Sequence, residues 1–272
     1  MKILALDSSG LVASVAVVED DGVNSSLLAE YTVNYKKTHS QTLLPMLDEI
    51  ARMIELDLNT IDAIAVAAGP GSFTGLRIGS ATAKGLGLAL DKPLVHVPTV
   101  DALAYNLYGT DRVICPLMDA RRNQVYTGIY EFRNNELSVI EPQMAVGIEV
   151  IAGKLRALGR EVVFLGDGVP VFRKALMEEL MQGMDFSFAP AHLNKQRAGA
   201  VAALAVSYVR AGKIETAAEH RPDYLRPSQA ERERAEKEAR EKAEKAKAEK
   251  AERVEKEKAE EQKEQKEAGL HE

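Results

Sequence analysis

The chain has 272 residues, which is long enough for one large domain or two small ones with real apolar cores. It carries 35 basic and 41 acidic residues, a net charge of −6. This charge argues against a protein that binds the phosphate backbone of a nucleic acid through its overall charge. Cys115 is the only cysteine, which excludes an internal disulfide and a zinc site built from several thiolates. The apolar stretch 3–6 is too short for a signal peptide or a membrane span, so we expect a cytoplasmic protein without membrane contact.

The first 110 residues predict a strand meander followed by alternating helices and strands. Apolar alternation and short apolar runs indicate strands at 3–6, 12–18, 27–33, 63–68 and 93–97. Helical spacing of apolar residues begins near Ser40, near Gly75 and near Val100, and the middle helix extends to about Leu90. Alternation of this kind predicts an α/β lobe.

A second lobe begins near Arg112, and its opening resembles the start of the chain. Residues 3–7 align without a gap with 115–119, and the strand 12–18 falls on 124–130, which suggests an internal duplication. Further helices are expected at 149–158, 171–180 and 198–209, with a strand at 161–165. We therefore divide the body into an N-terminal lobe, 1–110, and a C-terminal lobe, 111–228.

The remaining segment, 229–272, has a different composition. From Ala230 onward it is built almost entirely of Ala, Glu, Lys and Arg. Glutamate precedes a base by four residues in Glu236–Arg240, Glu241–Lys245 and Glu249–Arg253, the favourable orientation for pairs on a helix surface. No apolar seam supports a coiled coil, so we expect a charged tail that is a solvated single helix or disordered.

Two loops are candidates for phosphate contact. The first comprises Asp7, Ser8, Ser9 and Gly10 at the end of a predicted strand, where hydroxyls and backbone N–H groups can hold a phosphate; the alternative is an ordinary hairpin turn. The second loop runs from Gly69 to Gly75 between a strand and a helix, a place where the helix N-terminus favours anions.

The second loop offers Gly69, Gly71 and Ser72 to an anion. It is not a P-loop, because it lacks the Gly-Lys-Ser/Thr ending, and its glycines are too widely spaced for a dinucleotide-binding fingerprint. Arg77, in the first turn of the helix, could reach a phosphate or an acidic partner, or could be a surface charge.

Small residues recur every four positions on the helix that follows, at Gly75, Gly79, Ala83 and Gly87. Such a face allows another backbone to approach closely, either the lobe's own first helix or a partner protein. We interpret His39, His96 and His192 as structural or surface residues, because no two stand four apart on a helix beside carboxylates. A catalytic triad cannot be argued without geometry.

Residues 68–77, AGPGSFTGLR, strongly resemble the TsaB family, also called YeaZ, the dimerisation subunit of the tRNA threonylcarbamoyladenosine machinery. The segments ILALDSSG, THSQTLLPML, MDARRNQVY, GDG and PDYLR are also similar to that family and occur in its order. The resemblance covers residues 1 to about 228. It implies a two-lobed actin-like ATPase fold, of the ASKHA or ribonuclease H-like type.

The resemblance also implies a role without catalytic residues of its own. Members of this family pair with a TsaD-type catalytic paralogue and a TsaE-type ATPase, and form a homodimer when alone. The complex transfers threonylcarbamoyl to adenosine 37 of tRNAs that read ANN codons, so tRNA would be contacted indirectly. The paralogue binds its metal with two histidines in a pattern like PLIGVHHMEGH, and the positions aligned with the histidines of that pattern are here Pro98, Thr99 and Leu103, which implies no metal.

The resemblance further implies no cofactor of the protein's own. Where an actin-type phosphate loop would need glycines, this chain has Asp119-Ala120-Arg121-Arg122, whose side chains would crowd a phosphate. An ADP or ATP held at the subunit junction is still compatible with the sequence. In this family the first two helices of the N-terminal lobe form the partner surface, which selects Leu43, Leu44, Leu47, Leu76, Gly79, Ala83 and Leu86.

Two other functions stay open from the sequence. One is an enzyme, either an actin-like-fold phosphotransferase or ATPase, or a metallopeptidase. The other is a direct tRNA-binding module, which the acidic body and the lack of a basic or aromatic stripe disfavour.

Overall fold

The structure is a computed structural model that describes residues 1–35, 38–226, 234, 237 and 240–242. It separates into two compact units, 1–225 and 226–272. In the second unit the described residues 234, 237 and 240–242 are helical, and Lys237 Nζ lies 4.0 Å from Glu241 Oε1. Each of the three glutamate–base pairs predicted in the tail includes a residue outside the described ranges.

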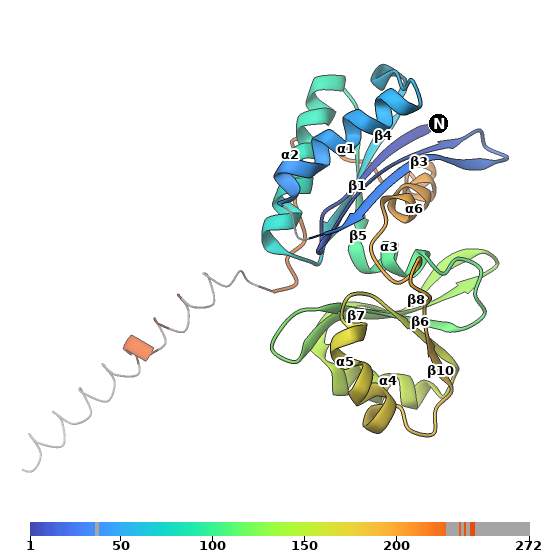
Figure 1. Ribbon diagram of the computed structural model, residues 1–272, viewed down its shortest axis with the longest axis vertical. Coiled ribbons are helices and arrows are strands. Elements are labelled where there is room, and N and C mark those ends of the chain that lie inside the picture. The colour runs from blue at the N-terminus through green and yellow to red at the C-terminus, as the bar shows by residue number, and fades with distance from the viewer. Residues whose placement is uncertain (36–37, 227–233, 235–236, 238–239, 243–272) are drawn as a thin grey trace, which may run out of the picture. The chain divides into compact units, whose positions relative to one another are not determined.

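The N-terminal lobe is built on a five-stranded mixed sheet (Figure 1). Its strand order is β3-β2-β1-β4-β5, with β1, β2 and β3 antiparallel and β4 and β5 parallel to β1. The strands are β1 Lys2–Asp7, β2 Val12–Asp20, β3 Ser25–Asn34, β4 Ala63–Gly69 and β5 Leu94–Pro98. All five strands predicted for this lobe are confirmed, with ends that differ by at most two residues.

Helices cover both faces of this sheet. The α-helices are α1 His39–Met53, α2 Phe73–Leu90, α3 Thr99–Tyr105 and α6 Ala198–Arg210, and a 3-10 turn spans Leu58–Thr60. Helix α2 begins two residues before the predicted Gly75, because the Ser72 hydroxyl accepts the backbone N–H of Gly75 and caps the helix.

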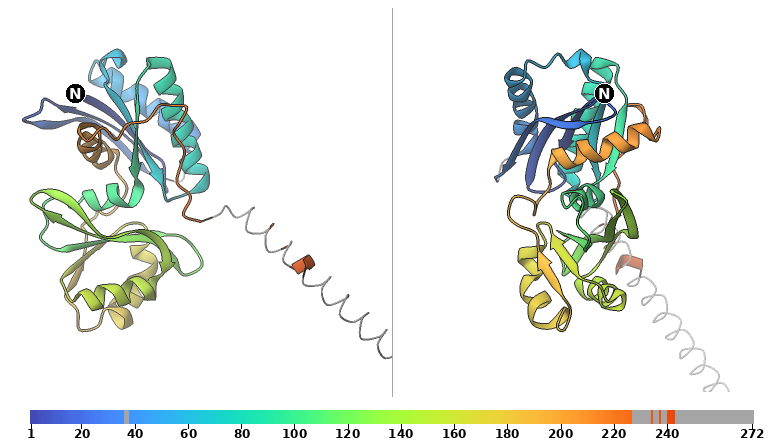
Figure 2. Two further views of the ribbon diagram at one scale, coloured as in Figure 1. Left: turned by 180° about the vertical axis from the view of Figure 1, so that it is seen from behind. Right: turned by 90° about the vertical axis from the view of Figure 1, so that its right-hand side faces the viewer.

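Alternation along the strands divides the core of the lobe into two layers. In β1, Leu4 and Leu6 face the layer that α1 and α2 cover, whereas Ile3 and Ala5 face the layer that α6 covers. Figure 2 shows α6, in orange, against the sheet on the side opposite α1 and α2. Since both faces are covered, β1 is buried along nearly its whole length.

Helix α6 belongs to the first sheet although it follows the second lobe in the chain. Its apolar residues Ala198, Val201 and Ala205 share one core cluster with Ile3 and Ala5. The sequence division placed this helix in the C-terminal lobe, 111–228. Periodicity predicts a helix and its apolar face but not the sheet it will cover, so this placement needed the structure.

The second lobe repeats the sheet of the first. Its strand order is β10-β9-β6-β7-β8, so the first strand of each half is central and the fourth and fifth lie on one side. The strands are β6 Val113–Asp119, β7 Gln124–Arg133, β8 Glu136–Gly147, β9 Val162–Leu165 and β10 Phe186–Phe188. The shared order supports the duplication and confirms the two-lobed α/β fold; β8 and β10 were not predicted.

Two helices complete the second lobe. Helix α4, Ile148–Leu158, agrees with the prediction, and its residues Ile151 and Leu155 pack in the lobe's core. The helix expected at 171–180 is divided into α5, Val169–Ala175, and a π-turn, Leu176–Leu180. No helix among the residues described is long and apolar enough to cross a membrane.

Candidate functional site

The turn after β1 is held beneath the N-terminus of α2. The Ser8 hydroxyl donates to the Gly75 carbonyl at 2.9 Å, and the Ser72 backbone N–H donates to the Ser9 carbonyl at 2.7 Å. Asp7, Ser8 and Ser9 are each at most 2% exposed. The two loops predicted to contact phosphate are therefore brought together, but largely by binding to one another.

The glycines of the second loop allow this close packing. A Cβ on Gly71 or Gly75 would overlap the backbone of Ser9 or Ser8, and a Cβ on Gly79 would meet the Ser8 hydroxyl. Gly69 has φ +129°, and a Cβ there would overlap the Asp223 carbonyl. These glycines thus serve contacts within the lobe, and the small-residue face of α2 covers its own sheet rather than α1 or a partner.

Asp7 is a buried carboxylate with two local donors. Its Oδ1 accepts the backbone N–H of Ser9 at 2.9 Å and the Ser9 hydroxyl at 2.7 Å. The pKa of Asp7 is raised to about 6, mainly by burial; the charge of Asp167 acts in the same direction, while the Ser9 hydrogen bonds and His39 oppose this rise. At neutral pH Asp7 is therefore a charge that the surrounding protein stabilises incompletely.

Buried polar atoms without partners gather beside Gly10. His39 Nε2 donates to the Gly10 carbonyl at 2.8 Å, which leaves His39 Nδ1 as an acceptor with no donor among the described residues. Gln196 packs so closely that a Cβ on Gly10 would lie 2.9 Å from its Nε2, and both of its amide atoms lack a described partner. Unpaired buried polar groups are uncommon, so this junction has capacity for a polar ligand.

The matching turn of the second lobe is more open and more charged. Arg121 is 84% exposed at its side chain, and its guanidinium lies 3.0 Å from Asp119 Oδ2. Asp119 Oδ1 accepts the Arg121 backbone N–H, and the Asp119 N–H donates to Asp167 Oδ1 at 3.2 Å. Burial raises the pKa of Asp167, and the charge of Asp119 adds to this effect. The carboxylates at this turn are therefore already engaged within the protein.

The eight predicted nucleotide contacts differ in accessibility. Asp7, Ser8, Ser9 and Gly69 are buried, Gly10 and Gly71 are half-buried, and Ser72 and Arg77 are exposed. The Arg77 guanidinium lies over the exposed Phe73 ring, 5.5 Å from its centroid. A nucleotide could reach only part of this set, and these assignments stay predictions.

The predicted partner surface needs correction at most of its residues. Leu43, Leu47, Leu76, Gly79 and Ala83 are buried, and the apolar side chains among them pack within the lobe. Of the seven residues chosen, Leu44 is exposed and Leu86 is half-buried. Helical periodicity selects the stripe that faces the protein's own core, which is why these residues stood out.

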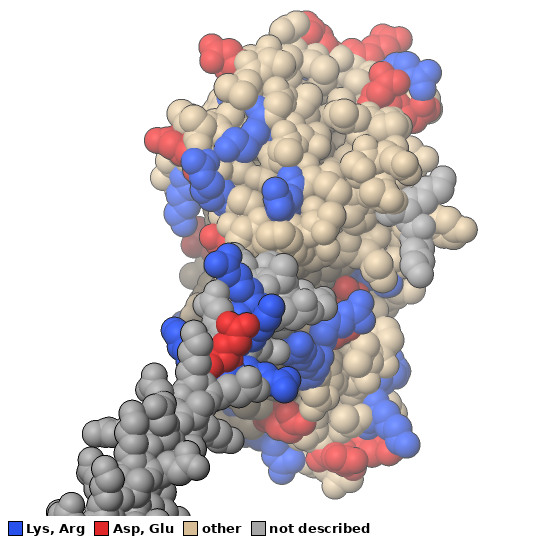
Figure 3. Space-filling view, turned by 90° about the vertical axis from the view of Figure 1, so that its left-hand side faces the viewer, with Lys and Arg blue, Asp and Glu red and all other residues tan. Residues whose placement is uncertain are grey.

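Leu44 and further residues of α1 and α2 form the exposed apolar surface of this side. Leu44 on α1 is 53% exposed, and Leu88 on α2 is 72% exposed. Figure 3 faces this side and shows few charged residues over the middle of the lobe, with more of them at its upper edge. A groove of about 800 Å³ between β3 and α1 adds Tyr31, Tyr35 and Met53 to the surface. We call the exposed side of these two helices the α1–α2 face.

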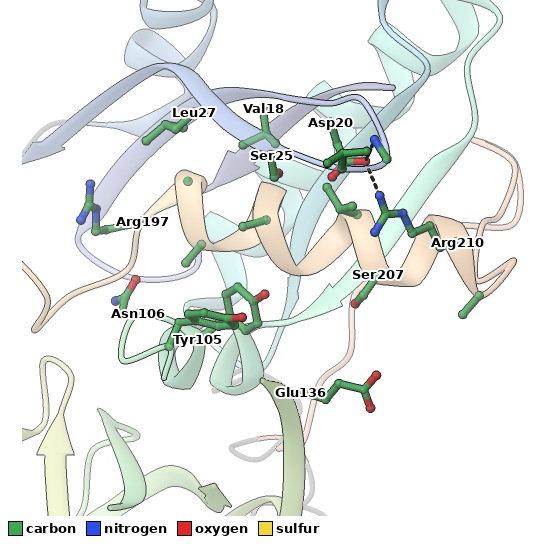
Figure 4. Close-up of a pocket in the computed structure, with 18 of the residues that line it drawn as sticks. Val18, Asp20, Ser25, Leu27, Tyr105, Asn106, Glu136, Arg197, Ser207 and Arg210 are labelled. Atoms are coloured by element: carbon green, nitrogen blue, oxygen red, sulfur yellow. Dashed lines mark hydrogen bonds and ion pairs between the residues drawn. The ribbon is translucent and has the colours of Figure 1, made fainter. Parts of the chain in front are cut away.

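A second groove, of about 950 Å³, lies along α6 (Figure 4). Two of its charged side chains are arginines paired within the protein, Arg210 with Asp20 and Arg197 with Glu30, and Glu136 also lines it. None of the predicted site residues lines it. Most of the residues that α6 contributes are small and have no reactive or charged side chain.

Sequence reasoning missed Gln196, Asp167 and His220 as residues with unusual surroundings. Asp167 stands in the Gly166–Gly168 turn, which was recognised only as a family segment. His220 is fully buried, and its Nδ1 donates to Glu215 Oε1 at 2.6 Å. No sequence motif predicts a role for Gln196 or His220, because the residues that surround them in the fold come from distant parts of the chain.

Comparisons with known proteins agree with this fold. Residues 26–234 match the family profile "TsaD: tRNA N6-adenosine threonylcarbamoyltransferase". The chain is 35% identical to the tRNA threonylcarbamoyladenosine biosynthesis protein TsaB of Bacillus subtilis (strain 168), over 85% of this chain and 96% of that protein. It is 34% identical to TsaB of Escherichia coli (strain K12), over 62% of this chain and 72% of that protein.

A solved structure gives the same result. YeaZ from Pseudomonas aeruginosa superposes with a TM-score of 0.69 at 28% identity, over 82% of this chain and 99% of that one. Both the sequence relatives and this structure extend across the two lobes, so the similarity is not confined to one motif. The resemblance inferred from AGPGSFTGLR is confirmed, as is the two-lobed actin-like fold, and the chain belongs to the TsaB family.

Proposed function

We propose that this protein is a non-catalytic subunit of the machinery that makes threonylcarbamoyladenosine in tRNA. In this proposal it pairs with a TsaD-type catalytic paralogue, acts together with a TsaE-type ATPase, and supports transfer to adenosine 37 of tRNAs that read ANN codons. The relatives named for this biosynthesis support the process, since one of them aligns with 85% of the chain. The tRNA contact is through the complex.

The observation that supports the non-catalytic role is that the polar groups of the two equivalent turns, after β1 and after β6, are already bound within the protein. In the first lobe Asp7, Ser8 and Ser9 are buried and bind one another or α2. In the second lobe Asp119 is paired with Arg121. An actin-type phosphotransferase needs the polar groups of both turns free to bind nucleotide, so this arrangement favours a supporting subunit over the alternative enzyme.

The α1–α2 face is the surface we propose for the catalytic paralogue, and for a second copy of this chain when the paralogue is absent. Exposed leucines at 44 and 88 supply apolar area there, and interface centres are poor in charge. The residues that carry the contact are therefore the exposed neighbours of the buried stripe first chosen from the sequence.

Reconstituted threonylcarbamoyl transfer to tRNA tests the role. The reaction would contain the catalytic paralogue and the ATPase from the same organism, with and without this chain, and the isolated chain would be assayed for ATP turnover. We expect transfer to require the chain and the chain alone to turn over no ATP. Unchanged transfer without the chain would reject the assignment, and ATP turnover by the chain alone would favour the phosphotransferase.

A nucleotide at the subunit junction is a separate proposal, supported by the unpaired atoms of Gln196 and His39 beside Gly10. ADP or ATP would be held where Gly10 is half-buried and the adjoining Gln196 is buried, with the partner closing the site. Equilibrium dialysis should show nucleotide bound to the complex and not to the isolated chain. Gln196→Leu should weaken this binding without changing assembly, and unaltered binding would contradict the placement.

A further inference from the structure

A cluster of imidazoles and carboxylates lies where the segment 213–224 crosses β5, away from the junction of the two turns. One ligand atom from each of His96, Glu215 and His220 lies within 4.8 Å of the others. The side chains of His96 and Glu215 are about one-quarter exposed, and His220 is fully buried. From this cluster we infer that the protein binds one divalent cation of the zinc class at His96, Glu215 and His220.

The hydrogen bonds of His96 leave one ring nitrogen available for a metal. His96 Nε2 donates to Asp223 Oδ2 at 3.0 Å, so in the neutral ring Nδ1 carries the lone pair. This Nδ1 lies 3.8 Å from Glu215 Oε1. A carboxylate that holds the far nitrogen of a metal-binding histidine is the usual support for such a ligand.

The separation fits a bridging zinc ion. Zinc–nitrogen and zinc–oxygen bonds add up to about 4.1 Å, so one ion can contact both His96 Nδ1 and Glu215 Oε1 without moving either far. Two nitrogens and one oxygen favour zinc over calcium or magnesium, which take oxygen ligands. With three protein ligands, the fourth position would belong to water.

His220 is buried in a form suited to metal binding. In the metal-free protein its Nδ1–H donates to Glu215 Oε1 at 2.6 Å; the ion would take the place of this proton, with Nδ1 as the ligand and the ring proton moved to Nε2, which has no hydrogen-bond partner among the described residues. Burial lowers the pKa of His220, which keeps the ring neutral, the state that coordinates metals. Lys84 opposes a cation here, since its Nζ donates to the His220 carbonyl at 3.2 Å, whereas Glu215 and Asp223 favour one.

The backbone holds the ligands in place before any ion binds. Glu215 exchanges two backbone hydrogen bonds with Leu94 of β5, at 2.9 and 2.8 Å. The His220 N–H donates to the Thr216 carbonyl at 3.1 Å, and the Asp223 N–H donates to the Ala68 carbonyl at 2.7 Å. The ligands therefore come from a strand and from a segment fixed to the sheet, which lowers the entropy lost on metal binding.

A bound ion would clamp this segment across the sheet edge. The segment continues from Asp223, whose carbonyl packs against Gly69, to Tyr224, whose ring lies 4.9 Å from that of Phe73 at the start of α2. The metal would thus stabilise the support behind the Gly69–Gly75 loop. This inference does not depend on the proposed function.

Metal titration of the untagged, EDTA-stripped full chain tests the site. Zn²⁺ would be titrated against a competing chromophoric chelator, and Co²⁺ would be followed by its visible absorption. The wild type should bind one equivalent, His96→Ala and Glu215→Gln should lose this site, and Asp223→Asn should weaken binding about 10- to 100-fold. His192→Ala, which removes an exposed histidine outside the cluster, should bind like the wild type.

Hydrogen exchange of the same samples gives an independent readout. Zn²⁺ should slow exchange of the amides in 214–223 in the wild type and in His192→Ala but not in His96→Ala. If Glu215→Gln fails to fold, His96→Ala still tests the site, because its side chain is partly exposed. Equal zinc affinity in the wild type, His96→Ala and Glu215→Gln would overturn the proposal and leave the cluster as hydrogen-bonded support only.

Discussion

The two lobes share a strand order but differ at the turn where each central strand ends. In the first lobe, the turn from Asp7 is closed over by α2, with glycine at each close approach. In the second lobe, the turn from Asp119 continues through Arg121, Arg122 and Asn123, all with left-handed backbone, and Arg121 extends into solvent. The two lobes therefore share one fold, but the turns that follow their central strands differ in chemistry.

The loops after the fourth strand of each sheet sharpen this comparison. Gly71 packs on Ser9 in the first lobe, and Gly168 packs on Leu117 in the second, so both loops rest on the end of the central strand. Between the glycines, the first lobe has Pro70 and the second has Asp167. The glycines therefore meet a packing requirement common to both lobes. The residue between them differs in chemistry, apolar in the first lobe and acidic in the second.

The largest expected effect comes from Gly75→Ala. Its Cβ would overlap the Ser8 carbonyl, so we expect a loss of about 3 kcal/mol or more in the free energy of unfolding. The control is Gly85→Ala on the same helix, where nothing lies within 4 Å and alanine should stabilise by about 1 kcal/mol. Urea unfolding of both variants measures this, and equal effects would contradict the packing account.

Asp7→Asn should stabilise the protein, because asparagine can still accept the Ser9 hydrogen bonds without a buried charge. The pKa of Asp7 is raised from 3.8 to about 6, so the charge destabilises the fold progressively as pH rises through this window. The gain should reach about 3 kcal/mol at pH 8 and be about half as large at pH 5.

Urea unfolding of the wild type and Asp7→Asn at the two pH values checks this sign. A loss of stability at pH 8 would contradict this sign. It would mean that the charged carboxylate of Asp7 stabilises the folded state through a favourable partner. A gain independent of pH would mean that the Asp7 carboxylate is not the group that titrates.

The smallest effect is expected at the second-lobe turn. Arg121→Gly removes a left-handed backbone penalty of about 1–2 kcal/mol and loses an exposed ion pair of under about 1 kcal/mol. A net gain of up to about 1 kcal/mol should appear in urea unfolding. Asn134→Gly in the same lobe should gain less, since asparagine tolerates this backbone better; a larger gain at Asn134 would refute the explanation.

The sequence predicted most of the elements because their signals are local. Strand alternation in β1 and β2, and the gap-free alignment of the two openings, depend only on neighbouring residues. The family segment AGPGSFTGLR then identified the fold. By contrast, α6 packs on a sheet that begins almost 200 residues earlier in the chain. The apolar pattern of α6 does not predict which sheet the helix will cover.

The functional residues were harder to predict for a physical reason. Leu43, Leu47 and Leu76 have the spacing of an apolar stripe, and a core and a partner surface both produce that stripe. Burial distinguishes the two and moves attention to Leu44 and Leu88. The His96, Glu215 and His220 cluster escaped notice because two of its members are separated from the third by more than a hundred residues.

The central claim is that the α1–α2 face binds the catalytic paralogue, and its affinity for variants of this chain tests it most directly. Leu44→Glu and Leu88→Glu should each weaken binding about 30-fold or more in calorimetric titration, because a charge would enter an apolar interface. Val171→Glu on α5, at a position 58% exposed, is the matched control and should bind like the wild type. Unchanged binding by both leucine variants, or equal weakening by all three, would contradict the account.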